Sequence, residues 1–240
     1  MKTAFDATGE VLIVTGGASG IGAAVIERYA AAGGTPVVFD VNDRSGPAGA
    51  RVEHHVVDVA DRDAVFAATK TVLARHGRID GLVCAAAIQP RQDVDDTDPQ
   101  LWRRTLDVNL DGVVWCCQAV IPSMKTARSG SIVVFASGLA TNGRAQAAAY
   151  AASKGALVSF AKSLAAEVAP DRVRVNTIYP GVIDTPQFRA ANPGAEYEFW
   201  RRTTGIGVPE DVAGPLLFLL SDAATMTGST LTRDRAYPKE

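Results

Sequence analysis

Short runs of apolar and β-branched residues alternate along the chain with longer alanine-rich stretches. The apolar runs predict strands at 11–15, 35–40, 51–59, 79–87, 130–137 and 172–180, with a last short strand at 228–232. The stretches between them have helical periodicity, several with acidic starts or glycine stops, and predict helices at 20–34, 61–77, 99–124, 147–169 and 209–222. Strands that alternate with helices are typical of an α/β protein whose parallel sheet is covered by helices on both faces.

Neither a Pro/Ser-rich linker nor an internal repeat divides the 240 residues. We therefore expect one doubly wound, three-layer, Rossmann-like domain over residues 1–240. In such a sheet, ligands bind beyond the carboxyl ends of the strands, near the point where the strand order reverses. The residues that carry chemistry are expected at that edge.

The longest connection, at about 186–204, contains four aromatic side chains, Phe188, Tyr197, Phe199 and Trp200. A connection of this length without an obvious strand pattern predicts a small lid over the substrate. An amphipathic helix whose aromatic side chains pack on the core would explain the same pattern.

Composition narrows the classes of function. The net charge is −2, which argues against a nucleic-acid-binding face, and no apolar run is long enough to predict a membrane span. The N-terminal residues have no apolar core of a secretory signal. Cys84, Cys116 and Cys117 have no disulfide or zinc spacing, so we expect buried, reduced thiols in a cytoplasmic protein. The three histidines have no metal-ligand spacing, and no metal is expected.

The segment TGGASGIG at 15–22 joins the first strand to the first helix. Gly16, Gly20 and Gly22 allow a tight turn and a close approach of the backbone to a pyrophosphate, and the helix N-terminus then offers free N–H groups. A tight turn without a ligand has the same sequence, so the turn alone decides nothing.

Two acidic residues follow predicted strands. Asp40 lies 18 residues after Gly22, near the offset at which an acid binds a ribose 2′-hydroxyl, and it would repel a 2′-phosphate. Because Ser19 beside the turn is neutral, the sequence favours NAD over NADP; a solvated acid at a strand end is the alternative. Asp58 could accept a hydrogen bond from an adenine amino group; a loop acid or the start of the next helix is the alternative.

The segment YAASK at 150–154 places a phenol and an ammonium group one helical turn apart. A neighbouring cation favours the phenolate, so we expect Lys154 to lower the pKa of Tyr150 from its ordinary value of about 10. Ser137, at the end of a predicted strand, adds a hydroxyl at the same sheet edge. An ordinary helix surface with one Tyr and one Lys is the alternative.

Taken together, these pieces resemble the short-chain dehydrogenase/reductase family over most of the chain. The resemblance rests on TGGASGIG, Asp40, DV at 58–59, VNLDG at 108–112, Ser137, YAASK and YPGVIDTP at 179–186. It implies that Tyr150 is the acid/base, that Lys154 holds the nicotinamide ribose, and that Ser137 hydrogen-bonds the substrate oxygen. Asn109 would support a water that relays protons to Lys154. The expected cofactor-binding residues are Gly16, Ser19, Gly20, Ile21, Gly22, Asp40, Asp58, Val59, Ala85, Ala86, Tyr150, Lys154, Pro180, Gly181, Ile183 and Thr185.

Two segments depart from the family pattern. CAAA at 84–87 stands where the family usually has Asn-Asn-Ala-Gly, so Cys84 replaces a bracing Asn and Ala87 adds a methyl group near the cofactor. The tail LTRDRAYPKE at 231–240 lacks the usual glycines, and Arg233 and Arg235 flank Asp234. The homotetramer or homodimer that the family implies is less firmly indicated because of this tail.

The sequence thus predicts an NAD-dependent oxidoreductase that transfers a hydride between the cofactor and the alcohol or ketone carbon of a small, polar substrate. Gln89, Gln146, Arg189 and Trp200 are the candidate substrate residues; Arg91, Gln92 and Arg144 flank the same edge. Such arginines and glutamines suit a hydroxy acid or a polyol, although they could also be solvated. A non-catalytic NAD-binding sensor or scaffold remains an alternative. An epimerase or dehydratase is disfavoured because the C-terminal portion is short.

Overall fold

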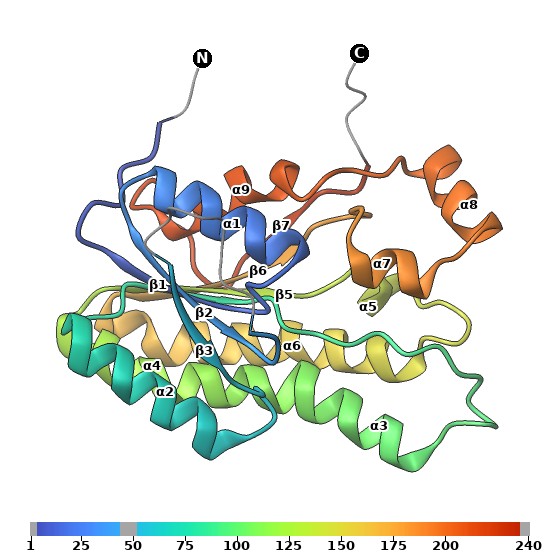
Figure 1. Cartoon of the computed structure of the whole chain (residues 1–240), viewed down its shortest axis with the longest axis horizontal. Helices are drawn as coiled ribbons and strands as arrows, with labels where there is room; N and C mark the ends of the chain where they lie inside the picture. The colour runs from blue at the N-terminus through green and yellow to red at the C-terminus, as the bar shows by residue number, and fades with distance from the viewer. Residues whose placement is uncertain (1–3, 44–51, 236–240) are drawn as a thin grey trace.

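A computed structural model describes residues 4–43 and 52–235. Its centre is a parallel sheet of seven strands in the order β3-β2-β1-β4-β5-β6-β7 (Figure 1). The strands are β1 (Val11–Thr15), β2 (Thr35–Asp40), β3 (Glu53–Val56), β4 (Gly81–Cys84), β5 (Gly130–Phe135), β6 (Val173–Tyr179) and β7 (Thr230–Thr232). The strand order reverses between β1 and β4, so ligands are expected beyond the carboxyl ends of these two strands.

Helices cover both faces of the sheet, which confirms the doubly wound, three-layer prediction. Helices α1 (Gly20–Ala31) and α9 (Glu210–Leu220) pack on one face, and α2 (Arg62–His76), α4 (Gly112–Ala127) and α6 (Ala148–Val168) pack on the other (Figure 1). Side chains alternate along β1. Leu12 and Val14 belong to the core between the sheet and helices α1 and α9, whereas Val11 and Ile13 belong to the core between the sheet and helices α2, α4 and α6. Every residue of β1 is therefore buried, as its continuous apolar run requires.

The helix predicted at 99–124 is divided. Helix α3 (Pro99–Leu106) passes through a π-helical turn, Asp107–Asp111, into α4. Such turns occur often at functional sites. This one carries Asn109, which is fully buried.

Two predicted strands, those at 51–59 and 79–87, are much shorter in the structure. β4 ends at Cys84 because the next two backbone N–H groups bond to Thr15, Ala85 N to its carbonyl oxygen at 3.2 Å and Ala86 N to its hydroxyl at 3.1 Å. β3 covers 53–56 of the predicted 51–59, and residue 51 lies outside the described residues.

The segment predicted as a lid forms two short helices, α7 (Pro186–Ala191) and α8 (Ala195–Thr203). They lie beyond the carboxyl edge of the sheet, near the short helix α5 (Leu139–Asn142) (Figure 1). Elsewhere, a 3₁₀ turn, Ala169–Asp171, follows α6. No residue of α8 is buried, and Phe199 is 57% exposed. The aromatic side chains of α8 therefore do not form part of the buried core.

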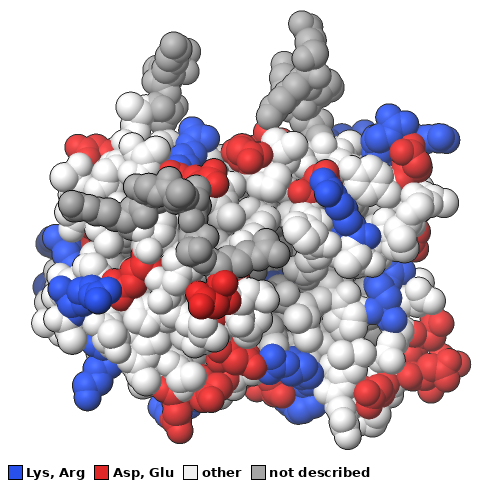
Figure 2. All heavy atoms as spheres, in the orientation of Figure 1, with Lys and Arg blue, Asp and Glu red and all other residues white. Residues whose placement is uncertain are grey.

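Charges of both signs are interspersed on the face of the molecule shown in Figure 2. Within residues 4–43 and 52–235, no helix has the length and apolar character needed to cross a bilayer.

Candidate active site

The glycine-rich turn after β1 has steric reasons for its glycines. Gly16 has φ +68°, and a Cβ there would lie 2.8 Å from the backbone of Ala86. A Cβ on Gly22 would overlap the carbonyl oxygen of Gly16. The turn therefore closes tightly on itself and on the loop after β4, and larger side chains are excluded.

The N-terminus of α1 is open to an anion. Ser19 is the N-cap residue, and its side chain makes no capping hydrogen bond. The N–H groups of the first helical turn point out of the helix and carry its positive dipole end. Because Ser19, Gly20 and Ile21 line a large cavity, these donors suit a phosphate group there.

Asp40 connects the end of β2 to this turn. It is 8% exposed, and its Oδ2 accepts a hydrogen bond from Ala18 N at 3.1 Å. Its Oδ1 accepts from the backbone and side-chain nitrogens of Asn42 at 2.9 and 3.0 Å. The carboxylate is thus fixed in the cavity wall, and Oδ2, which accepts only one of these bonds, still has a lone pair for a ribose hydroxyl.

Asp58 lies at the edge of the same cavity and pairs with Arg104 at 2.7 Å. It does not start the following helix: Asp61 caps α2, and its Oδ1 accepts from Ala64 N at 3.0 Å. Val59 is buried against Gly112, where a Cβ would lie 2.8 Å from the valine methyl.

Cys84, where the family resemblance implies an asparagine, is the last residue of β4. Cys84 is 2% exposed and hydrogen-bonds the thiol of Cys117, and burial raises the pKa of Cys116 beside them. All three thiols are buried and free, which confirms the prediction of buried, reduced cysteines. Ala85, Ala86 and Ala87 follow along the cavity wall.

Ser137, Tyr150 and Lys154 line this cavity, which has a volume of about 570 Å³. The hydroxyl of Ser137 hydrogen-bonds the phenol of Tyr150. Lys154 is 2% exposed; its Nζ lies 5.7 Å from the centre of the Tyr150 ring and donates to Phe135 O at 2.8 Å. The three polar groups predicted from separate motifs therefore meet at one place.

In the chain without a bound cofactor, the pKa of Tyr150 is raised and not lowered as expected. Burial raises the pKa of Tyr150 to about 12, and the hydrogen bond from Ser137 opposes that rise. Burial also lowers the pKa of Lys154 to about 8, with the neighbouring Cys84 opposing it. The prediction that Lys154 lowers the pKa of Tyr150 is thus corrected. Burial of the phenol, and not the ammonium group one helical turn away, dominates its pKa.

Asn109 does not line the cavity. Its Oδ1 accepts from Ile88 N at 2.8 Å, and its Nδ2 donates to Ile88 O at 2.9 Å and to Ser153 Oγ at 3.2 Å. The side chain joins the π-helical turn to the loop after β4 and to the residue before Lys154. Its direct contacts are therefore structural braces around the site.

The loop after β6 closes the other side of the cavity through Pro180, Gly181 and Ile183. Gly181 has φ +76°, and a Cβ there would lie 2.5 Å from Arg233 O. A Cβ on Gly20 would lie 3.1 Å from the methyl group of Thr185, so this loop reaches the glycine turn. All residues of the expected cofactor set line the cavity.

Only two of the four candidate substrate residues, Gln89 and Trp200, line the cavity. Gln146 bonds elsewhere: its Oε1 accepts from Arg91 at 3.3 Å, and its Nε2 donates to Asp93 at 3.2 Å. The guanidinium of Arg189 pairs with Asp184 at 2.6 and 2.7 Å, which holds it away from the cavity. The structure thus separates Gln146 and Arg189 from the predicted substrate position.

Among the cavity residues that the predicted site did not include are Arg144, Asn192 and Arg233. Arg144 is six residues before Tyr150 and had been noted only as a flanking residue, and Asn192 is 1% exposed between α7 and α8. Arg233, from the atypical tail, pairs with Asp211 at 3.4 Å, and its backbone N–H bonds to Tyr179 O at 2.9 Å. The pairing of β6 with β7 brings it there, so only the tertiary fold could have shown it.

No group of three or more metal-ligating side chains occurs in the described part of the chain. Two of the three histidines instead contact Glu53, which pairs with His55 at 2.7 Å and His76 at 2.8 Å.

A family model described as short chain dehydrogenase matches residues 10–196. The chain is 39% identical over 245 residues to D-threitol dehydrogenase of Mycolicibacterium smegmatis, covering 97% of this chain and 94% of that protein. It is 32% identical over 234 residues to a 3-oxoacyl-[acyl-carrier-protein] reductase of Chlamydia trachomatis, covering 92% of this chain and 94% of that protein. The crystal structure of a 3-ketoacyl-(acyl-carrier-protein) reductase from Brucella melitensis complexed with NADH matches with a TM-score of 0.87 at 29% identity, covering 95% and 97%.

Proposed function

Because this chain belongs to the short-chain dehydrogenase family, we propose that it is an NAD-dependent oxidoreductase acting on a secondary alcohol or ketone. The observation that carries the proposal is the meeting of Ser137, Tyr150 and Lys154 in the cavity that also contains the glycine turn. The substrate of this proposal is a small, polar molecule, as the name of the related D-threitol dehydrogenase suggests.

The residues present fit a nicotinamide dinucleotide. The open N-terminus of α1 would hold its pyrophosphate, and the cradle between Gly16 and Ala86 has no space for a Cβ. Asp40 would accept from the ribose hydroxyls and would repel a 2′-phosphate. The cofactor, when bound, supplies hydride transfer and, in its oxidised form, a positive charge.

The chain's own groups would handle the proton. Tyr150 would exchange a proton with the substrate oxygen, and Ser137 would hold that oxygen by a hydrogen bond. Lys154 would bind the nicotinamide ribose from its buried position, and Asn109 would brace the segment around it. With Lys154 charged, a second positive charge from the cofactor favours the phenolate and so opposes the high pKa that burial gives Tyr150.

A panel of secondary alcohols, hydroxy acids and polyols tests the proposal, with NADH and NADPH formation followed by absorbance. We expect turnover with NAD to exceed turnover with NADP. Asp40→Ala should reduce this preference about 10-fold or more, because it removes a charge-assisted hydrogen bond to the ribose. Equal use of both cofactors by the unmodified protein would exclude the role given to Asp40.

The alternative, a non-catalytic NAD-binding sensor or scaffold, predicts NAD binding without turnover of any compound in this panel. The CAAA segment at 84–87 and the tail beyond Leu231 are the departures that favour it. The proposed enzyme would work as a homodimer or homotetramer in the cytoplasm, and sedimentation of the purified protein would test the oligomer.

A further inference from the structure

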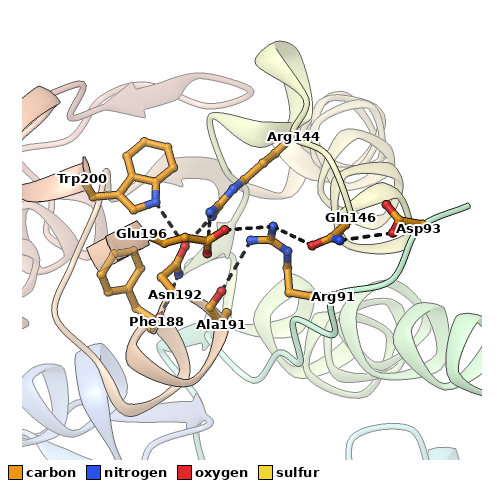
Figure 3. Close-up of polar contacts among 9 residues, drawn as sticks. All are labelled: Arg91, Asp93, Arg144, Gln146, Phe188, Ala191, Asn192, Glu196 and Trp200. Carbon is orange, nitrogen blue, oxygen red and sulfur yellow. Dashed lines mark hydrogen bonds and ion pairs between the residues drawn. The ribbon is translucent and has the colours of Figure 1, made fainter. Parts of the chain in front are cut away.

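Two arginines, Arg91 and Arg144, lie beside the segment 186–204, and both side chains are mostly buried. The side chains of Arg91 and Arg144 are each 17% exposed, and only Glu196 of the lid, 44% exposed, forms ion pairs with them in the described part of the chain. Figure 3 shows the carboxylate of Glu196 between the two guanidinium groups. Its oxygens lie 2.9 Å from Arg144 and 3.6 Å from Arg91.

The local charge is therefore unbalanced. The other partners of Arg91 are neutral: Gln146 Oε1 at 3.3 Å and Ala191 O at 3.5 Å. Its Nε is buried and has no hydrogen-bond partner among the described residues. Two mostly buried cations that share one half-exposed carboxylate leave a net positive charge, which an anion bound beside them would balance.

Arg144 is the one of the two that lines the cavity, as do Tyr150 and Trp200. Its side chain is held in position: one nitrogen donates to Asn192 Oδ1, and the guanidinium lies 5.2 Å from the centre of the Trp200 ring. Trp200 Nε1 donates to the same Asn192 oxygen at 3.1 Å, and Asn192 Nδ2 donates to Phe188 O at 2.8 Å (Figure 3). A guanidinium has five N–H donors, so several remain for a ligand.

We propose that Arg144, with Arg91 behind it, binds a carboxylate of the substrate, so that the enzyme acts on secondary hydroxy acids or the corresponding keto acids. Glu196 occupies the neighbouring position and competes with the substrate carboxylate for the two guanidinium groups. Arg144 is thus a specificity residue, separate from the proton-transfer groups. The proposal rests on the proposed oxidoreductase function and names its substrate class.

Matched acids and amides test the proposal. The kcat/KM with NAD is measured for 3-hydroxybutyrate and 4-hydroxycyclohexanecarboxylate, for the carboxamide of each, and for D-threitol as a neutral polyol. Unmodified protein should prefer an acid over its carboxamide by about 10- to 100-fold, the range of a charge-assisted hydrogen bond. Arg144→Gln should bring that ratio close to one, whereas Arg144→Lys should retain part of it.

Glu196→Gln separates this proposal from a purely structural latch. If Glu196 competes with the substrate, its loss should lower KM for the acids several-fold and leave the amides unchanged. If the Arg144–Glu196 pair only holds the segment 186–204 in place, Arg144→Gln and Glu196→Gln should lower kcat/KM for acids and amides by the same factor. The proposal then fails. Arg201→Gln is the control, because Arg201 is on the same helix and pairs with Glu198 at 2.9 Å.

The failure of the proposed function has a different signature. If no compound is turned over with either cofactor, the oxidoreductase proposal fails, and calorimetric binding of cyclohexanecarboxylate and cyclohexanecarboxamide then tests the carboxylate site alone. Acid-selective binding that Arg144→Gln removes would support the site. Faster turnover of D-threitol than of every acid, or no acid preference in either assay, would overturn it.

Discussion

Lys154 gives a prediction about stability that depends on pH. Its ammonium group is almost completely buried and donates to Phe135 O at 2.8 Å. Burial lowers its pKa from 10.5 to about 8. This difference corresponds to about 3 kcal/mol by which folding disfavours the charged form relative to the neutral one.

The sign follows from proton binding. Because the folded pKa is below the unfolded one, the unfolded chain binds more protons between about pH 8 and 10.5, and the free energy of unfolding rises with pH there. Lys154→Met removes this dependence but leaves Phe135 O without its donor, at about 1–3 kcal/mol. We expect the variant to equal or slightly exceed the unmodified protein in stability at pH 7, and to be less stable than it at pH 10.

Urea unfolding followed by circular dichroism at both pH values measures the effect. Lys162→Met is the matched control, because Lys162 is an exposed lysine on the same helix, α6. The difference between unmodified protein and Lys154→Met should change by about 2–3 kcal/mol over this pH range, and the control difference should not change. A Lys154→Met difference that is the same at both pH values would refute the burial argument.

Two further substitutions test other parts of the structure. Gly22→Ala should weaken NAD binding at least 10-fold, because the new Cβ overlaps Gly16 O. Gly214→Ala on α9 is the control: its new Cβ meets only the flexible end of Arg28 at 3.4 Å, and calorimetry should show unchanged NAD binding. For Glu53, burial raises the pKa, but hydrogen bonds from His76, His55 and Arg75 outweigh it and lower the pKa to about 2. Glu53→Gln should therefore lower the free energy of unfolding by about 1–2 kcal/mol at pH 7, after a discount for solvent screening. This loss should shrink as the pH falls from about 4.5 toward 2. Urea unfolding measures it, with Glu27→Gln, at an exposed position on α1, as the control.

The strands that the sequence located best are those with abrupt ends. β1 and β2 have the predicted bounds because glycine turns or acids follow their apolar runs directly. The end of β4 at Cys84 was not predictable, because the three alanines that follow it have no signal for leaving the sheet. The π-helical turn around Asn109 was also hidden, because VNLDG keeps an ordinary helical pattern.

The cofactor-binding side of the site was easier to predict than the substrate side. Glycines and strand-end acids mark the first by local geometry, and all the predicted positions line one cavity. The direction of an arginine depends on its tertiary partners: Asp184 holds Arg189 outside, while Glu196 and Asn192 hold Arg144 at the cavity. The cost of burying Lys154 likewise could not be read from its spacing to Tyr150.

The most direct test of the account is a comparison of hydride transfer and NAD binding in Tyr150→Phe. This variant keeps the ring and removes only the hydroxyl that would exchange the proton. We expect NADH formation from the best substrate to fall about 100- to 10,000-fold while the Kd for NAD changes less than about threefold. A Tyr150→Phe protein that forms NADH at the unmodified rate would contradict the account.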